Sequence, residues 1–180
     1  DQTTTSVALS VDDDTDYLYD IANNVSNQSS AVSLTMKHIR SKLVVRIERD
    51  DYTGNGIISN GTIEGSALYI NGNFDLKTEK LTSSDNVKQI SFSGTIPETG
   101  TLEEEWFVFS AYGTATSNLS FTFTIDGITY TTVKSTESVK FEKGKKYIFN
   151  ISVGNHKVEV SQVDILPWGD GANKNLNVTD

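Results

Sequence analysis

The chain of 180 residues carries a net charge of −9 and contains no cysteine. The acidic surplus disfavours nucleic acid and anionic membrane surfaces as partners, because both require clustered Lys and Arg. The absence of cysteine excludes disulfides and thiolate metal sites. Hydrophobic residues make up 36% of the chain, which is enough for a thin β-sandwich core, and no apolar run approaches the roughly 20 residues that a membrane-spanning helix needs.

The N-terminal residues 1–30 are polar and weakly patterned, so they are predicted to form a linker or arm with one short strand at residues 7–11. This segment contains an acidic cluster formed by Asp12, Asp13, Asp14, Asp16 and Asp20. Such a cluster could offer oxygen ligands to Ca²⁺, but it lacks the spaced D-x-[DN]-x-[DN]-G loop. A solvated acidic loop is therefore the favoured interpretation, and the sequence predicts no metal and no cofactor.

The next strong strand pattern changes parity in its middle. Leu34, Met36 and His38 share the even positions, whereas Leu43, Val45 and Ile47 share the odd ones. This change predicts a bulge or bend at residues 39–42. His38 lies mid-strand on the apolar parity, where it could be a ligand or a base. The other histidine, His156, lies at a predicted hairpin tip. The sequence therefore favours His38 as a histidine that is hydrogen-bonded inside the sandwich.

Aromatic residues are dense around residues 106–112, and this density predicts a strand that is buried on both faces. The side chains concerned could instead form a platform for stacking sugars; they are Trp106, Phe107, Phe109 and Tyr112. A core strand is the favoured interpretation. The preceding run of glutamates at 103–105 gives no facing pair for glycoside hydrolysis, and no G-x-S-x-G stretch is present. The sequence therefore predicts no enzyme.

Two hairpins are predicted in the C-terminal half. Asp126-Gly127 favours a two-residue type I′ turn with Ile125 opposite Ile128. In the second hairpin, residues 154–155 are predicted to form a two-residue loop.

This loop places Val153 opposite His156 and gathers the apolar residues of both arms on one face. A later parity change predicts a bulge near residues 161–162. Pro167 then ends the ladder, and Trp168 is expected to plug the end of the sandwich.

Strands of this length, separated by turns about every 8–12 residues, are typical of an all-β, antiparallel two-sheet sandwich. The sandwich is predicted over residues 31–168, followed by a polar tail at residues 169–180. Its uncovered edges would accept an added strand. Candidate donor strands are residues 3–11 and residues 173–179, although both are polar for donors.

Three stretches resemble features of the Bacteroidales fimbrillin-like proteins of type V pili. Residues 16–19 resemble their "D-x-L-Y" segment, and residues 34–45 resemble their "L-x-F-x-H-x-x-(A/S)-K-(L/I)-x-V" strand. Residues 143–168 resemble their closing signature, which begins with "G-K-x-Y" and ends with a tryptophan. The order and spacing also fit. The residues that carry the motifs in this chain are Tyr19, His38, Lys42, Tyr147 and Trp168.

This resemblance implies a Greek-key, transthyretin-like sandwich in a non-enzymatic protein of the cell surface, secreted as an outer-membrane lipoprotein. The chain is expected to be the C-terminal domain of a longer precursor, together with its linker. The implied partners are other pilus subunits, joined by strand donation, or protein and glycan ligands on host or bacterial surfaces. The alternative is a sandwich that binds glycans or host proteins without polymerising.

Overall fold

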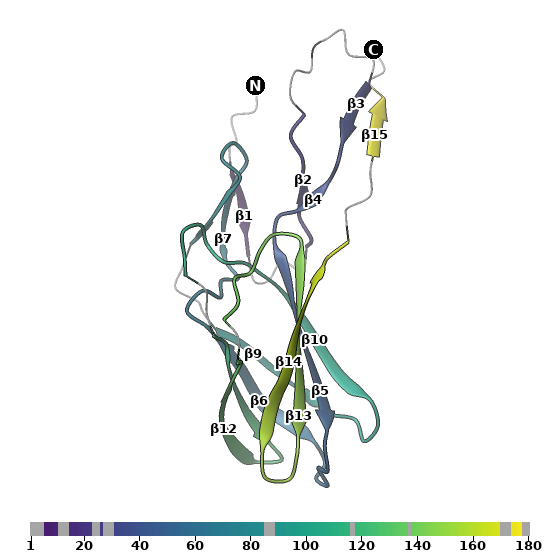
Figure 1. The fold of residues 1–180 in the computed structure, drawn as a ribbon, viewed down its shortest axis with the longest axis vertical. Helices are drawn as coiled ribbons and strands as arrows, with labels where there is room; N and C mark the ends of the chain where they lie inside the picture. The colour runs from purple at the N-terminus through teal and green to yellow at the C-terminus, as the bar shows by residue number, and fades with distance from the viewer. Residues whose placement is uncertain are drawn as a thin grey trace.

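The structure, a computed structural model, describes residues 6–10, 15–22, 26, 31–84, 89–115, 118–136, 138–169 and 174–177. Every regular element in these residues is a β-strand (Figure 1), which confirms the predicted all-β class. No helix within the described residues is long and apolar enough to cross a membrane.

Two four-stranded sheets pack against each other and form the predicted sandwich. In the first sheet the order is β10 (Thr101–Val108), β5 (Ser41–Arg49), β13 (Lys145–Val153) and β14 (Val158–Pro167). In the second the order is β12 (Ile128–Lys134), β11 (Ser120–Ile125), β6 (Ile57–Glu64) and β9 (Gln89–Thr95). Alternating residues of both sheets share one buried core, so the two-sheet prediction is confirmed. The transthyretin-like connectivity stays a prediction.

The central pair of the first sheet differs from the antiparallel pattern that was predicted throughout. Strands β5 and β13 run parallel, with Leu43 beside Tyr147 and Val45 beside Phe149. A parallel pair is normally covered on both faces, and accordingly Val44, on the outer face, is fully buried. The alternation of side chains predicts a strand and its buried face, but it does not reveal which distant strand pairs with it.

Aromatic side chains dominate the centre of the sandwich. Phe121 of β11 and Phe149 of β13 are both fully buried, and their ring centroids lie 5.4 Å apart across the two sheets. Burying one such side chain contributes about 1.5–3 kcal/mol. The period-two pattern of these strands therefore supplies the main stabilising term of the fold.

The β11–β12 turn has the predicted register, with Ile125 opposite Ile128. Asp126 has a φ of 50° and Gly127 a φ of 79°. Positive φ at both central residues is what a type I′ turn requires, so the sequence signal and the geometry agree.

The β13–β14 loop differs from the prediction. Val153 pairs with Val158, not with His156, so residues 154–157 form a four-residue loop. A shift of two residues keeps every side chain on its face, and the apolar pattern therefore fits both loops equally well. The bulge predicted near residues 161–162 is confirmed, since the register shifts after Asn150.

A second, smaller core lies beside one end of the sandwich (Figure 1). Its sheet has the order β1 (Ser6–Leu9), β7 (Gly72–Asp75) and β8 (Lys80–Ser83). Leu9 and Tyr19 are buried in this core together with Phe74 and Phe109. The division into a linker at residues 1–30 and a sandwich from residue 31 remains a prediction, but the described part of that linker contributes side chains to a packed core.

Two short ribbons extend from the same end. Strand β2 (Leu18–Tyr19) pairs with β4 (Lys37–His38), and β3 (Ala31–Leu34) pairs with β15 (Lys174–Asn177), both antiparallel. The β3–β15 ribbon points away from the sandwich (Figure 1). The break between β4 and β5 falls at residues 39–40, where the parity change was predicted.

Candidate functional site

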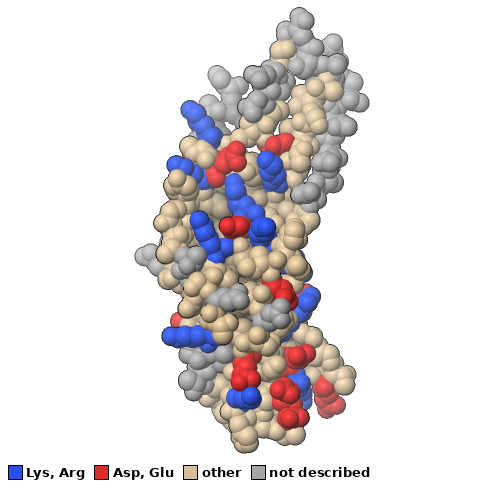
Figure 2. Space-filling model, viewed as in Figure 1, with Lys and Arg blue, Asp and Glu red and all other residues tan. Residues whose placement is uncertain are grey.

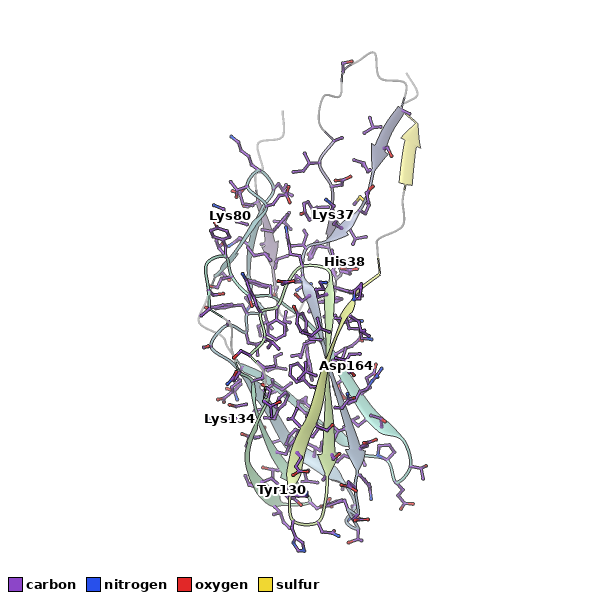
Figure 3. The ribbon with its side chains drawn as sticks, viewed as in Figure 1. Lys37, His38, Lys80, Tyr130, Lys134 and Asp164 are labelled. Atoms are coloured by element: carbon purple, nitrogen blue, oxygen red, sulfur yellow. The ribbon has the colours of Figure 1, made fainter. Side chains whose placement is uncertain are left out.

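The motif residues converge at the end of the sandwich from which both ribbons emerge. We call this region the junction; its residues are Tyr19, His38, Arg40, Lys42, Glu79, Phe107, Lys143 and Trp168. Figure 3 shows His38 here, where β4 leads into β5 and the chain leaves β14. Four of the five motif residues, all except Tyr147, therefore lie in one place although they are far apart in the sequence.

Trp168 is the centre of the junction. Its ring stacks on His38, with centroids 4.0 Å apart and an interplanar angle of 10°, and on Phe107, with centroids 5.4 Å apart. The Lys42 ammonium lies 5.5 Å from the Trp168 ring. The Trp168 backbone N–H donates to the carbonyl of Gly144. These contacts fasten the chain to the sandwich directly after β14 ends.

Both ring nitrogens of His38 are hydrogen-bonded, as the sequence favoured. Nδ1 lies 2.9 Å from the Asp16 carboxylate and Nε2 lies 2.6 Å from the Gly169 carbonyl oxygen. Both partners are acceptors, so both bonds form at once only when both nitrogens carry hydrogens. The site is the junction and not the sandwich core, and His156 lies exposed in the distant β13–β14 loop. His38 therefore links the N-terminal segment, the sandwich and the chain after Trp168.

Two cations flank the stack. Arg40 is 1% exposed, and its guanidinium lies 4.7 Å from the Phe107 ring and 5.6 Å from the Tyr17 ring. It also donates to the Thr15 carbonyl. Because a buried charge requires partners, these contacts hold residue 15 against the sandwich. Lys42 forms an ion pair of 2.5 Å with Glu105 on the neighbouring strand β10.

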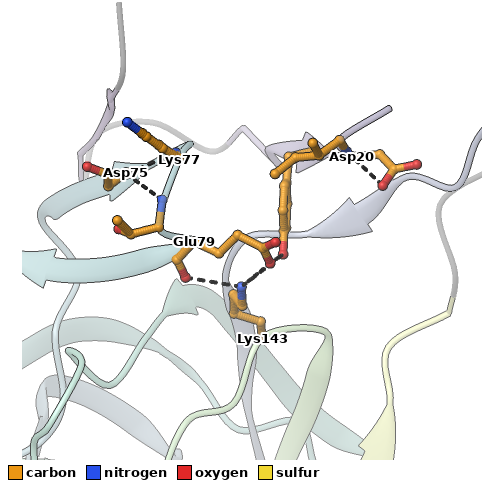
Figure 4. Close-up of polar contacts among 8 residues, drawn as sticks. Asp20, Asp75, Lys77, Glu79 and Lys143 are labelled. Carbon is orange, nitrogen blue, oxygen red and sulfur yellow. Dashed lines mark hydrogen bonds and ion pairs between the residues drawn. The ribbon is translucent and has the colours of Figure 1, made fainter. Parts of the chain in front are cut away.

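A second polar cluster joins the ribbons to the small sheet (Figure 4). The Tyr19 hydroxyl donates to Glu79 Oε2 at 2.6 Å, and Lys143 Nζ donates to the Tyr19 hydroxyl at 2.9 Å. Burial, and then the hydrogen bond to Glu79, raise the pKa of Tyr19 far above its usual range. Burial also lowers the pKa of Lys143. The three groups satisfy one another, an arrangement that suits a structural brace.

A hollow of about 320 Å³ lies between these two clusters. It is lined by Tyr19, Lys37, His38, Lys143, Gly144 and Trp168.

The hydrogen bond from Tyr19 lowers the pKa of Glu79, so the brace should weaken in acid. A lowered carboxyl pKa contributes stability that is fully present above the ordinary value of 4.5 and is lost as the pH falls through the folded-state value. We expect the melting temperature of Glu79→Gln to lie below that of the wild type at neutral pH, and the gap to narrow as the pH falls below 4.5 towards the lowered folded-state pKa. Thermal melts of both proteins across that range test this. A gap that stays constant with pH would show that the Glu79 charge does not stabilise the fold.

Tyr147, the remaining motif residue, lies on β13 beside Leu43 of β5 and is 2% exposed. Its hydroxyl donates to the Lys140 carbonyl at 2.5 Å and accepts from the Glu142 backbone N–H at 3.0 Å. Burial raises its pKa. Tyr147 therefore holds in place the turn that carries Lys143.

The aromatic residues in and directly after β10 do not form a common platform. Trp106 faces the sandwich core, with its ring 5.5 Å from Phe92, whereas Phe107 faces the opposite side and Phe109 belongs to the second core. Tyr112 is 69% exposed and lies apart from them, below the Lys80 ammonium. A platform shared by these four residues is therefore wrong. The favoured core interpretation is confirmed for Trp106 and Phe109, whereas Phe107 is half-buried in the junction and Tyr112 is exposed.

The acidic residues have local roles where they are described. Asp20 accepts hydrogen bonds from the backbone N–H groups of Ile21 and Thr35, which lowers its pKa. Residues 12–14 of the predicted cluster lie outside the described residues. In the part of the chain that the structure describes, no group of three or more His, Asp or Glu could hold a metal ion.

The run of glutamates at 103–105 lies on edge strand β10. Glu103 pairs with Arg46 at 2.7 Å, and Glu105 pairs with Lys42, both across to β5. Charged side chains on an edge strand discourage unwanted strand addition. The β10 edge is therefore protected by its own charges.

Sequence reasoning missed Arg40, Phe107, Glu79 and Lys143 as members of the junction. A charged residue such as Arg40, placed directly at the parity change, is the one local signal that could have indicated a buried polar contact. Glu79 has a φ of 54°, but no sequence pattern linked it to Tyr19.

Known proteins share the sequence pattern and the fold of this chain. The family model described as fimbrillin-like matches residues 1–168. The fold is similar to a candidate cell adhesion protein from Bacteroides ovatus, with a TM-score of 0.64 and 18% identity, covering 92% of this chain and 61% of that structure. A second such protein, from Bacteroides uniformis, has a TM-score of 0.58 and 17% identity, covering 93% and 68%.

At this level of identity, the structures establish only the shared fold, and the chain spans about three fifths of the length of the first one. Among curated proteins, none matches. The match of the family model over residues 1–168, a range that includes all three motifs, shows that the chain belongs to the fimbrillin-like family.

Proposed function

We propose that the chain is a non-enzymatic structural or adhesive domain of a surface pilus, acting as a pilus subunit or as a tip or anchor domain. We further propose that it joins its neighbours by donating a β-strand. Membership of the fimbrillin-like family supports the pilus-related role. The observation that carries the assembly mechanism is the β3–β15 ribbon, which projects from the body as a two-stranded sheet (Figure 1).

The two predicted donors differ in how firmly they are held. The described part of residues 3–11 is β1, which pairs with β7 and buries Leu9 to 3% exposure in the second core. The described part of residues 173–179 is β15, which pairs only with β3 among the described strands. An isolated two-stranded ribbon is marginally stable in water. Releasing β15 therefore costs less than releasing β1, and β15 is the proposed donor.

The sequence around β15 also suits strand donation. Leu176 and Val178 alternate with polar residues, so an extended donor would present both on one face. In strand addition, backbone hydrogen bonds supply affinity and alternate side chains supply register. Trp168 holds the chain against the sandwich six residues before β15, so the donor strand would extend from an anchored residue.

A disulfide lock tests whether β15 is exchanged. Ser33 and Asn175 lie directly opposite each other in the ribbon, and the chain has no cysteine of its own. We expect Ser33→Cys/Asn175→Cys to hold β15 on β3 when oxidised and to abolish SDS-resistant ladders after the precursor is processed. Reduction should restore the ladders.

The matched control is Thr124→Cys/Thr129→Cys. These residues lie opposite each other in the β11–β12 hairpin, with their hydroxyls 3.1 Å apart, so this variant adds a disulfide without touching the ribbon. Its ladders should match those of the wild type in both redox states. If the oxidised ribbon variant also forms normal ladders, β15 is not the donor.

A further inference from the structure

A second hollow lies at the end of the sandwich opposite the junction. It has a volume of about 1010 Å³ and is lined by Arg49, residues 51–55, residues 95–98 and Asn155. These segments are the loops after β5, β9 and β13, which meet at the lower end in Figure 1. We call this the distal hollow. Its volume lies at the upper end of the range for small-ligand sites, about 300–1,000 Å³.

The floor of the distal hollow is braced by Arg49. Its guanidinium donates to the carbonyl oxygens of Gly54, Asn55 and Ile96, each at 2.7 Å. These bonds tie the loop after β5 to the loop after β9. Its N–H groups are thus engaged by the protein itself, so the site does not present a free guanidinium to a ligand.

A second set of bonds holds the loop after β5 to the loop after β13. The Asn155 side-chain oxygen accepts from the Thr53 backbone N–H and hydroxyl, each at 3.1 Å, and its amide donates to the Asp51 carbonyl. The Tyr52 hydroxyl donates to Asp126 at 2.7 Å. The rim is therefore formed before any ligand arrives, which reduces the entropy cost of binding.

Two carboxylates at the rim remain available to bind a ligand. The side chains of Asp51 and Glu98 are exposed at the rim, and within the described residues neither carboxylate has a hydrogen-bond or ion-pair partner. Carboxylates accept hydrogen bonds from hydroxyl groups and repel anions. The surface at this end shows more carboxylates than cations in Figure 2. Together with Thr53 and the ring of Tyr52 in the lining, this chemistry suits a ligand that is rich in hydroxyls and carries no negative charge.

We infer that the distal hollow binds a neutral carbohydrate. The inference rests on the adhesive part of the proposed function. It adds to that function a class of ligand and the place on the domain where the ligand binds. A domain held to its neighbours through the β3–β15 ribbon keeps the distal hollow at its opposite end, where it faces outward. Strand donation is not needed for the binding itself.

An array of neutral oligosaccharides, each printed beside its sialylated counterpart, tests this with the full chain. We expect binding to neutral members and weaker binding to the sialylated counterparts. The variant Asp51→Asn/Glu98→Gln preserves side-chain shape, and asparagine tolerates the φ of 62° at position 51. It should weaken the affinity for the bound neutral oligosaccharides by about tenfold or more.

The matched control is Glu64→Gln, the same chemical change at an exposed residue at the end of β6, and it should leave binding unchanged. In addition, amide NMR shifts of the wild type titrated with the same oligosaccharides should cluster at residues 51–55 and 95–98. Absence of neutral binders, a preference for sialylated glycans, unchanged affinity in the double variant, or shifts clustered elsewhere would each overturn the inference. The ladder assay reports assembly separately, so failure here and failure of strand donation are distinguishable.

Discussion

Replacing Phe109 with alanine is expected to lower the stability of the small β1–β7–β8 sheet by about 3–5 kcal/mol, the usual cost of deleting a buried aromatic ring. Phe109 is fully buried and stacks on Tyr69 with ring centroids 5.8 Å apart. Its ring fills the space above Gly72, where an added Cβ would clash with Phe109 Cζ. Hydrogen exchange measured by mass spectrometry should show lost protection in β1, β7 and β8, while β5 and β13 remain protected.

The control for this prediction is Phe149→Ala. Phe149 is equally buried but belongs to the main core, so its loss should accelerate exchange throughout the sandwich. Because the same side chain is deleted in each core, the two variants together show whether the cores unfold independently. If Phe109→Ala exposes β5 and β13 to the same extent as β1, the two clusters unfold as one unit and the prediction is wrong.

Replacing Trp168 with alanine is expected to release the chain that follows β14. The substitution removes the ring between His38 and Phe107, and a half-buried tryptophan should contribute about 2–3 kcal/mol, less than a fully buried one. We expect faster proteolytic cleavage after residue 168 and a lower urea midpoint. In the ladder assay, the Trp168→Ala protein should assemble less efficiently, because its donor strand is no longer anchored to the sandwich.

Trp168→Phe serves as the conservative partner to that variant. A phenyl ring can still stack between His38 and Phe107, so cleavage should return close to the wild-type rate. Equal cleavage rates for the alanine variant and the wild type would show that the stack does not hold the C-terminal segment.

The comparison of sequence and structure shows which features local patterns can predict. The parity change at residues 39–42 correctly located the break before β5. Side chains alternate between the two faces of a continuous strand, so the apolar residues can change parity only where the strand is interrupted. The same rule could not determine the β13–β14 loop. Pairing Val153 with His156 or with Val158 leaves every side chain on its own face, so the pattern cannot distinguish a two-residue loop from a four-residue loop.

The junction was only partly predictable, for a different reason. The family motifs singled out His38, Lys42 and Trp168, but their contact depends on the parallel pairing of β5 with β13. This pairing sets Lys42 beside Lys146, about a hundred residues further along the chain. No local period encodes such a partner, and therefore the stacking of Trp168 on Phe107 and the burial of Arg40 could only come from the structure.

The parallel pairing also has a mechanical consequence. Lys42 at the start of β5, Lys146 at the start of β13 and Leu166 near the end of β14 lie in one row across the sheet. The chain therefore enters and leaves the sandwich at the same end (Figure 1). Tension applied along the polypeptide would cross that row and tend to peel β14 from β13 one pair at a time, without shearing the whole ladder. Resistance to pulling would then reside in the contacts of Trp168 and Arg40, while the opposite end of the domain stays outside the path of the force.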